Sequence, residues 1–402
     1  MNGEIALFSL KAPEDPLNGG DLRIWTLLGG GDATVVCLGR KDVNGDGEKL
    51  EARLPWRHVH QIAGDVVFPP LPIWEWSEKR WMRSSPGHFS SLQGALEEVV
   101  ISRPGMAWLA CPLLDGLLLS SLVPDYRPAI DITDSNSLYF LRRFRNLRNS
   151  HPLKRMNALY QSWRWLQLER KAALGASAVF TAGEEDRAYL SRHTGARVLS
   201  FGSGTPWVDE PVLPKACDPK VRRIAFFGGM TWEPNRLAAR YLATNLLPVL
   251  RRMDASLEIQ IAGAASGRYL ADLEATEGVR MRGFIPDLRA WLATCDVFVM
   301  PMFQGAGVKS KLIEAMAAGM AVVTNEIGAE SLPARARSAV VIAEGTEAMA
   351  AAVMEVIGNP ARRGELERKA REAAEHCFSP LAVSAAYRDA VLSTTRPWTI
   401  GR

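Results

Sequence analysis

One stretch of the chain, residues 295–319, combines an apolar strand, a glycine loop and the start of a helix. Val297–Met300 is a short continuous apolar run, which is typical of a parallel strand covered on both faces. Gly305 and Gly307 follow, and glycine allows a sharp turn that leaves backbone N–H groups accessible. This order of elements predicts a parallel α/β sheet with a loop at the carboxyl end of one strand.

Two lysines lie where the helix after this loop should begin. Lys309 and Lys311 are cations at a helix start, where the helix dipole disfavours positive charge. A bound anion would remove the conflict, and Glu314, one turn later, could then accept hydrogen bonds from sugar hydroxyls. The alternative is a solvated loop in which Lys311 and Glu314 form an ordinary helix pair. This stretch alone leaves both interpretations open.

Apolar runs alternate with helical segments along the whole chain, which indicates doubly wound α/β domains with parallel sheets. In the first half we expect strands over 5–10, 33–38, 65–68, 106–111, 129–133, 178–181 and 197–201, and helices over 21–28, 91–101, 138–147, 153–174 and 184–193. In the second half we expect strands over 224–227, 257–261, 279–283, 297–300, 321–324 and 340–343, and helices over 235–252, 309–318, 347–356 and 362–376.

The length of 402 residues allows two domains, and a Gly- and Pro-rich stretch near its middle marks the boundary. We expect an N-terminal Rossmann-like domain over 1–205, a linker over 206–220 and a second Rossmann-like domain over 221–378. A last helix, within 379–402, is expected to pack back on the first domain. Because ligands bind at the carboxyl ends of parallel strands, the predicted site is a cleft between the two sheets.

The composition, 47% hydrophobic and 23% charged, is that of a globular protein in water. The five cysteines are scattered without metal-ligand spacing, which favours reduced thiols and a cytoplasmic location. The apolar run at the N-terminus, residues 5–10, is too short for a signal peptide or a membrane span. The net charge of +4 is mild and does not indicate nucleic acid as a partner.

Several other strand ends carry glycines, at Gly228 and Gly229, at Gly263 and at Gly283. Each could be a tight strand–helix turn or a place where the backbone approaches a phosphate. Asn235 is a plausible cap for the helix after the first pair, and Phe284 and Ile285 are placed to border a flat base. The repetition at successive strands is more specific than any single glycine.

Two segments of the first half could also face the cleft. The loop with Gly19 and Gly20, followed by Arg23, is either a second backbone-exposing loop or a turn. Asp131 and Asp134 lie at a strand end, where Asp134 and Ser135 could equally cap the next helix.

Residues 141–171 carry nine Arg or Lys against one acid, Glu169. Tyr160, Trp163 and Trp165 are interleaved with these cations. Such a segment could contact anionic lipid or nucleic acid, but a solvated helix face has the same composition, and no continuous apolar face is obvious.

The motifs of residues 222–330 resemble the superfamily of retaining glycosyltransferases with the GT-B fold, of the group 1 or family 4 type, which use nucleotide sugars. The resemblance is carried, in order, by Phe227-Gly228-Gly229-Met230 with Pro234-Asn235, by Ile261-Ala262-Gly263, by Gly283-Phe284-Ile285-Pro286-Asp287 and by Gly305-Ala306-Gly307-Val308-Lys309-Ser310-Lys311-Leu312-Ile313-Glu314-Ala315-Met316. In the first half, Gly19-Gly20 looks like the family's first glycine loop, and Asp131 to Ser135 and Glu169 look like the branch that builds bacterial surface polysaccharides.

The resemblance implies roles for individual residues. Lys309, Lys311 and the Gly228-Gly229 loop would hold the diphosphate, Glu314 the ribose, and Phe284 and Ile285 the base. The donor-binding set that it implies is Gly228, Gly229, Asn235, Gly263, Phe284, Ile285, Gly305, Gly307, Lys309, Lys311 and Glu314; the catalytic set is Asp134, Lys309 and Glu314; the acceptor side is Gly19, Gly20, Arg23 and Asp134. Three positions depart from the pattern: Ala306 replaces a first glutamate, Met230-Thr231-Trp232-Glu233 replaces a basic pair, and Thr133-Asp134 replaces a His-Asp pair.

The activity that the resemblance implies is transfer of a sugar, of the hexosyltransferase kind, from a nucleoside diphosphate sugar to a polysaccharide, glycolipid or other glycoconjugate. It implies retention of configuration with no metal and no cofactor. The cysteine pattern favours the cytoplasm, and the basic segment 141–171 could bring the protein into peripheral contact with an anionic membrane. Two alternatives remain open at this point: a nucleotide-sugar epimerase of the same fold, and a non-catalytic protein that binds nucleotide sugars.

Overall fold

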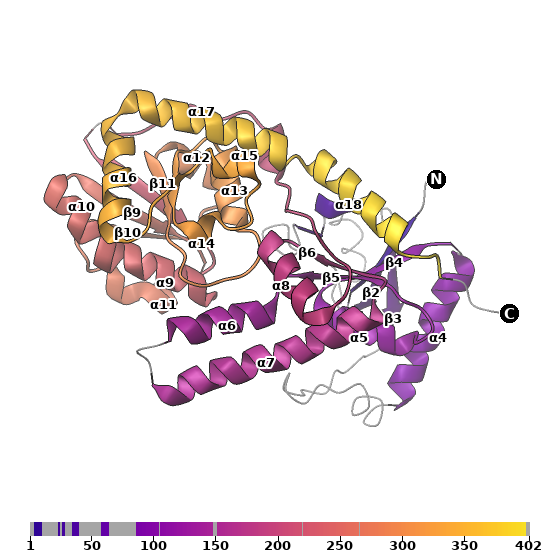
Figure 1. Cartoon of the computed structure of the whole chain (residues 1–402). Helices are drawn as coiled ribbons and strands as arrows, with labels where there is room; N and C mark the ends of the chain where they lie inside the picture. Colours follow the sequence, from indigo (N-terminus) through magenta and orange to yellow (C-terminus); the bar gives the residue numbers. More distant parts are fainter. Residues whose placement is uncertain are drawn as a thin grey trace. The chain divides into compact units, whose positions relative to one another are not determined.

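The computed structural model describes residues 4–9, 23–24, 26–28, 34–39, 58–63, 86–103, 105–147, 151–218, 220–264 and 266–398 (Figure 1). Contacts divide the chain into two compact units. Unit 1 is Met1–Gly204 with Pro380–Arg402, and unit 2 is Thr205–Ser379. Each unit has one sheet whose strand pairs are all parallel, which confirms the predicted α/β architecture.

Unit 1 has a seven-stranded sheet in the order β3-β2-β1-β4-β5-β6-β7. Its strands are β1 (Ile5–Ser9), β2 (Thr34–Gly39), β3 (His58–Ala63), β4 (Ala107–Ala110), β5 (Ala129–Thr133), β6 (Ala178–Thr181) and β7 (Val198–Ser200). Its helices include α4 (Pro86–Ser102), α5 (Leu113–Leu122), α6 (Asn136–Asn146), α7 (Pro152–Gly175), α8 (Glu184–Thr194) and α18 (Pro380–Thr394). The chain order reverses between β1 and β4, the kind of position where ligands bind in doubly wound sheets.

Two elements of unit 1 differ from the sequence-based expectation. The predicted strand over 65–68 lies outside the described residues, and the third strand is β3, which pairs with β2 from His58 onward. Helix α5 was not predicted at all. Its sequence, LLDGLLLSSL, is apolar around most of its circumference because it is largely buried, so it shows no clear helical period.

Unit 2 has a six-stranded sheet in the order β10-β9-β8-β11-β12-β13. Its strands are β8 (Arg222–Phe227), β9 (Leu257–Ala262), β10 (Val279–Gly283), β11 (Val297–Met300), β12 (Val322–Thr324) and β13 (Val341–Ile342). Its helices include α9 (Glu233–Tyr241), α10 (Leu247–Met253), α11 (Ser266–Leu270), α12 (Leu288–Ala293), α13 (Ser310–Ala317), α14 (Glu326–Ala329), α15 (Ala334–Arg337), α16 (Thr346–Gly358) and α17 (Pro360–Cys377). The single helix expected over 235–252 is α9 and α10 joined by a π-helical turn over Leu242–Leu246, which precedes Pro248.

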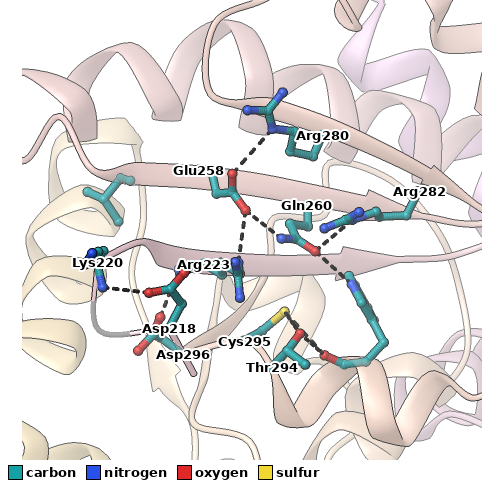
Figure 2. A network of polar contacts seen from close by, with 12 residues as sticks. Asp218, Lys220, Arg223, Glu258, Gln260, Arg280, Arg282, Thr294, Cys295 and Asp296 are labelled. Atoms are coloured by element: carbon teal, nitrogen blue, oxygen red, sulfur yellow. Dashed lines mark hydrogen bonds and ion pairs between the residues drawn. The ribbon is translucent and has the colours of Figure 1, made fainter. Parts of the chain in front are cut away.

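The core of unit 2 is built on the central strands, which are covered on both faces. Phe226 on β8 and Phe298 on β11 are fully buried, and their rings stack with centroids 6.5 Å apart. A polar ladder crosses β8, β9 and β10 (Figure 2). Gln260 lies at its centre, where its Oε1 accepts from Arg282 Nε at 3.0 Å and from Trp291 Nε1 at 2.9 Å. These bonds tie β10 to β9 just before the strand end that carries Phe284.

Residues 206–220, expected as a linker, begin with a segment that packs within unit 2. Pro206–Asp209 forms a 3-10 turn. The Arg371 guanidinium on α17 donates to the backbone oxygens of Trp207 and Val208 at 2.9 and 2.7 Å. The start of this stretch is therefore held on the surface of α17.

The last helix, α18, belongs to unit 1. Tyr387 on α18 is fully buried, and its hydroxyl donates to Asp131 Oδ2 on β5 at 2.8 Å. Its ring lies against Phe180 and Phe201, with centroids 5.1 and 5.4 Å away. None of the described helices combines the length and apolarity needed to cross a bilayer.

Candidate functional site

The carboxyl ends of β8, β9 and β10 bring three glycine segments side by side. The N–H of Gly228 donates to Ala262 O at 3.0 Å, and the N–H of Gly263 donates to Gly283 O at 2.6 Å. A Cβ built on Gly263 would lie 1.9 Å from Gly228 O, and the φ of Gly263 is +147°. Only glycine fits this close backbone approach.

Gly228 also leaves room for two polar side chains. A Cβ at Gly228 would lie 2.7 Å from Asn235 Nδ2 and 3.1 Å from Lys311 Cε. The structure thus places Lys311, from the first turn of α13, against the glycine pair that follows β8. Two segments that are 83 positions apart in the sequence (311 − 228) meet at one point of the sheet edge.

Asn235 does not cap α9, so the expectation of a cap was wrong. The helix begins at Glu233 with Trp232 as its N-cap residue, and Asn235 lies inside its first turn. Its Nδ2 donates to Gly229 O at 2.9 Å, while its buried Oδ1 has no hydrogen-bond partner among the described residues. Asn235 therefore fixes the glycine loop and offers one acceptor beside it.

The loop after β11 is held by a neighbouring side chain. Met302 N–H donates to Asn325 Oδ1 at 3.0 Å, and Asn325 Nδ2 donates to Met302 O at 2.7 Å. Gly305 and Gly307 then have φ values of +139° and +67°, where side chains are strained. Gln304 is buried, and no described group accepts a hydrogen bond from its Nε2.

Lys309 makes contacts with the loop itself. Its ammonium donates to Gly307 O at 2.6 Å and to Ala306 O at 3.3 Å, and the side chain is buried. It is also the N-cap residue of α13, which begins at Ser310. The first N–H groups of a helix lack intrahelical partners, so α13 directs donors toward the same place.

Lys311 and Glu314 have strongly perturbed acidities. Burial lowers the pKa of Lys311 to about 8, and the charge of Lys309 acts in the same direction. Burial also raises the pKa of Glu314 to about 7, against the effect of Lys311. The ammonium of Lys311 is therefore poorly stabilised by its protein surroundings, and an anion placed beside it would favour the charged form.

The end of β10 presents an aromatic ring to solvent. Phe284 is 60% exposed, whereas Ile285 packs against the core of unit 2. Gly283 has a φ of +63° and turns the chain between strand and ring. An exposed ring beside a glycine loop can stack on a flat ligand.

On the unit 1 side, Arg23 lies in the interior. Its guanidinium pairs with Asp131 Oδ2 at 3.1 Å and donates to the backbone oxygens of Phe201 and Gly202 at 2.6 and 2.7 Å. The same carboxylate accepts from Tyr387. Arg23 thus joins three segments of unit 1, and its side chain is buried. Gly19 and Gly20 lie outside the described residues.

The end of β5 has an unusual backbone. Thr133 is β-branched yet has a φ of +64°, and Asp131 Oδ1 accepts from its N–H at 2.7 Å. Ser135, not Asp134, is the N-cap of α6, with its Oγ accepting from Leu138 N–H at 3.2 Å. The capping alternative is therefore confirmed for Ser135. Strain of this kind clusters at functional sites, and it sets the position of Asp134.

Comparison with known proteins places this geometry in context. Residues 221–359 match the sequence profile of the family "Glycosyl transferases group 1". A search of curated proteins found no match to the chain. Among solved structures, sucrose-phosphate synthase from Thermosynechococcus elongatus has a TM-score of 0.69 at 14% identity, covering 98% of this chain and 100% of that one.

Two other structures are similar over their whole length. HepE of Anabaena, solved with UDP, has a TM-score of 0.65 at 13% identity and covers 97% of this chain and 100% of its own. A glycosyltransferase from Rickettsia africae has a TM-score of 0.62 at 11% identity, with 98% and 99% covered. The fold is GT-B.

Sequence reasoning named Ser135 and Glu169 but did not predict the buried cluster that they form in the GT-B chain. Glu169 on α7 is fully buried and accepts from Ser137 N–H and Ser135 Oγ, each at 3.1 Å, and from Ser137 Oγ. Asp186, also buried, accepts from Ser135 N–H at 2.8 Å. Burial raises the pKa of Glu169 to about 7. The one signal in the sequence was a lone acid inside a strongly basic segment.

Proposed function

We propose that this chain is a glycosyltransferase that moves a sugar from a nucleoside diphosphate sugar to a polysaccharide, glycolipid or other glycoconjugate. The observation that carries the proposal is the place of Lys311, against Gly228 and beside the start of α13. The profile match over residues 221–359 supports the reaction class. Two similar structures support the donor class, since HepE was solved with UDP-glucose and TarM of S. aureus with UDP.

The proposed chemistry follows from charge. Breaking the bond between sugar and diphosphate leaves negative charge on the diphosphate oxygens. Lys311 and the first N–H groups of α13 would stabilise that charge, which is the contribution a metal ion makes in other enzymes. Retention of configuration and independence of metal are parts of this proposal. Lys309, which holds the loop carbonyls, would keep the donors of the loop in position.

The other residues receive roles consistent with their surroundings. Glu314 would accept hydrogen bonds from the ribose hydroxyls, and Phe284 would stack on the base. The glycines at 228, 229 and 263 would let the backbone approach the diphosphate. Asp134, set by the strained turn at Thr133, would serve the acceptor side, with Arg23 as a buried positioning residue.

Calorimetric titration of UDP and of uridine tests the proposal. Lys311→Ala should weaken UDP binding by about 1.5–3 kcal/mol, the range for a charge-assisted hydrogen bond, which is roughly 10- to 150-fold. The affinity for uridine, which lacks the diphosphate, should change little. Lys369→Ala is the matched control, because Lys369 lies on α17 and pairs with Glu365.

Equal losses for UDP and uridine would contradict the assignment of Lys311 to the diphosphate. A wild-type protein that binds UDP-sugars but neither hydrolyses nor transfers them would favour the non-catalytic alternative.

A further inference from the structure

Exposed apolar side chains gather on one face of α7. Thirteen large apolar side chains are exposed in the described part of the chain, and six belong to this helix: Leu153, Met156, Leu159, Tyr160, Trp163 and Leu174. Four of them, at 153, 156, 160 and 163, follow helical spacing and form what we call the α7 stripe. Their exposed fractions are 68%, 65%, 51% and 58%.

The opposite face of α7 is buried in unit 1. Ala158, Ser162, Ala172 and Ala173 face the interior, and Ser162 Oγ donates to Ser137 O on α6 at 2.8 Å. Helices α6 and α7 run side by side (Figure 1). The helix is therefore held by the fold, and its outward stripe is a fixed feature of the surface. No continuous apolar face was obvious in the sequence, and the exposed fractions of these side chains in the structure reveal it.

The stripe has an aromatic end. The rings of Tyr160 and Trp163 stack with centroids 6.2 Å apart, and the Arg164 guanidinium lies 5.9 Å from the Tyr160 centroid. Tyrosine and tryptophan have an apolar body and a polar edge, and they concentrate at the headgroup level of bilayers. Leu153 and Met156 add apolar side chains, whose transfer out of water is favourable.

The surface around the stripe is positive. The described residues of α6 and α7 include eight Arg or Lys: Arg142, Arg143, Arg145, Lys154, Arg155, Arg164, Arg170 and Lys171. Their single acid is Glu169, which is fully buried. The described parts of these two helices therefore expose apolar groups and cations but no carboxylate, a combination complementary to an anionic lipid surface.

We propose that the α7 stripe docks unit 1 on a bilayer containing anionic phospholipid, with the cations of α6 and α7 on the lipid phosphates. A second copy of this chain is a poorer occupant, because a symmetric contact would bring two basic surfaces together. Nucleic acid fits less well, because leucine and methionine side chains offer no stacking surface for bases. The inference rests on unit 1 alone, and it places the protein where membrane-bound acceptors are found.

Flotation with lipid vesicles tests the inference. The full-length protein is mixed with vesicles of phosphatidylcholine alone or of phosphatidylcholine with phosphatidylglycerol, at low and at high salt. We expect binding to the anionic vesicles at low salt, with about a fivefold loss for each cation screened. The double variant Met156→Ser/Trp163→Ser should bind at least roughly tenfold more weakly, because two apolar side chains no longer leave water.

Matched controls separate the stripe from general exposure. Leu381→Ser on α18 and Met253→Ser on α10 remove exposed apolar side chains elsewhere, 80% and 57% exposed, and should bind as the wild type does. All variants change surface residues, so their melting temperatures should stay unchanged. Lys311→Ala should also bind vesicles normally, which keeps this test independent of donor binding.

Four results would overturn the inference. These are wild-type protein that stays unbound with anionic vesicles at low salt, equal binding to neutral and anionic vesicles, equal binding by the stripe variant and the wild type, and a wild-type dimer that the stripe variant dissociates.

Discussion

The affinity for UDP should fall as the pH rises past 8, because of Lys311. The protein surroundings lower the pKa of Lys311 to about 8, mainly by burial. A bound diphosphate favours the ammonium form, so its pKa in the complex is higher. Below pH 8 the charge is already present; above it, binding must take up a proton. The affinity therefore decreases by up to tenfold for each pH unit above the free pKa.

The size of the effect follows from the protonated fraction. With a pKa of about 8, Lys311 is about nine-tenths protonated at pH 7 and about one-tenth protonated at pH 9. UDP should therefore bind roughly tenfold more weakly at about pH 9 than at about pH 7. Phosphate groups complete most of their ionisation near pH 6, so the charge of the diphosphate changes little over this range.

Isothermal titration of UDP across this pH range measures the effect, and three comparisons identify its origin. Uridine should show no such decrease. Lys311→Arg should flatten the curve, since a guanidinium stays charged throughout. Glu314→Gln should move the decrease to lower pH, because the Glu314 carboxylate raises the pKa of Lys311. A UDP affinity that is constant from pH 7 to 9 in the wild type, or the same slope in the arginine variant, would refute the reasoning.

Two further predictions concern stability. Gly263→Ala should lower the unfolding free energy of unit 2 by about 3 kcal/mol or more, because the added Cβ would lie 1.9 Å from Gly228 O. Gly267→Ala is the control, since its Cβ would enter open space and its melting temperature should equal that of the wild type. Equal melting temperatures for the two variants would contradict the close approach at Gly263. Glu169 has a pKa raised from 4.5 to about 7, so its stabilising contribution is present below pH 4.5 and is lost as the pH rises through 7. Urea denaturation measures the unfolding free energy of the wild type minus that of Glu169→Gln, and this difference should fall by about 3 kcal/mol between pH 4.5 and pH 7. A difference that does not change with pH would show that Glu169 is exposed to solvent.

The sequence allowed most of the fold to be predicted, because strand and turn signals are local. The runs at Ala129–Thr133, Ala178–Thr181 and Val297–Met300 are strands over the predicted residues. A buried parallel strand must be apolar over consecutive positions, and this requirement is visible without any tertiary information. Helix α5 was not predicted, because a helix that is buried on most sides is apolar throughout and lacks the periodicity that marks a helix in a sequence.

The candidate site was predicted as a set of glycines and lysines but not as an arrangement. Gly305 and Gly307 adopt the positive φ angles that their residue type permits. Lys309, predicted to hold a diphosphate, donates to the carbonyl oxygens of its own loop, a contact that the sequence did not indicate. Asn235, expected as a cap, holds Gly229 from inside α9. Both outcomes depend on which backbone groups lie within reach, and residue type and spacing do not specify that.

The sequence by itself determined the α/β class, the glycine-rich strand ends and the lysine-bearing helix start, because φ preference, apolar runs and charge are properties of short segments. The tertiary structure alone decided which side chains became partners. Asp131 accepts from Tyr387, 256 positions away, and pairs with Arg23 in the opposite direction along the chain. Lys311 reaches Gly228 in the same way. Such contacts form only when the sheet places distant strand ends together, and burial at those contacts, rather than residue type, then sets the pKa values on which the proposed chemistry depends.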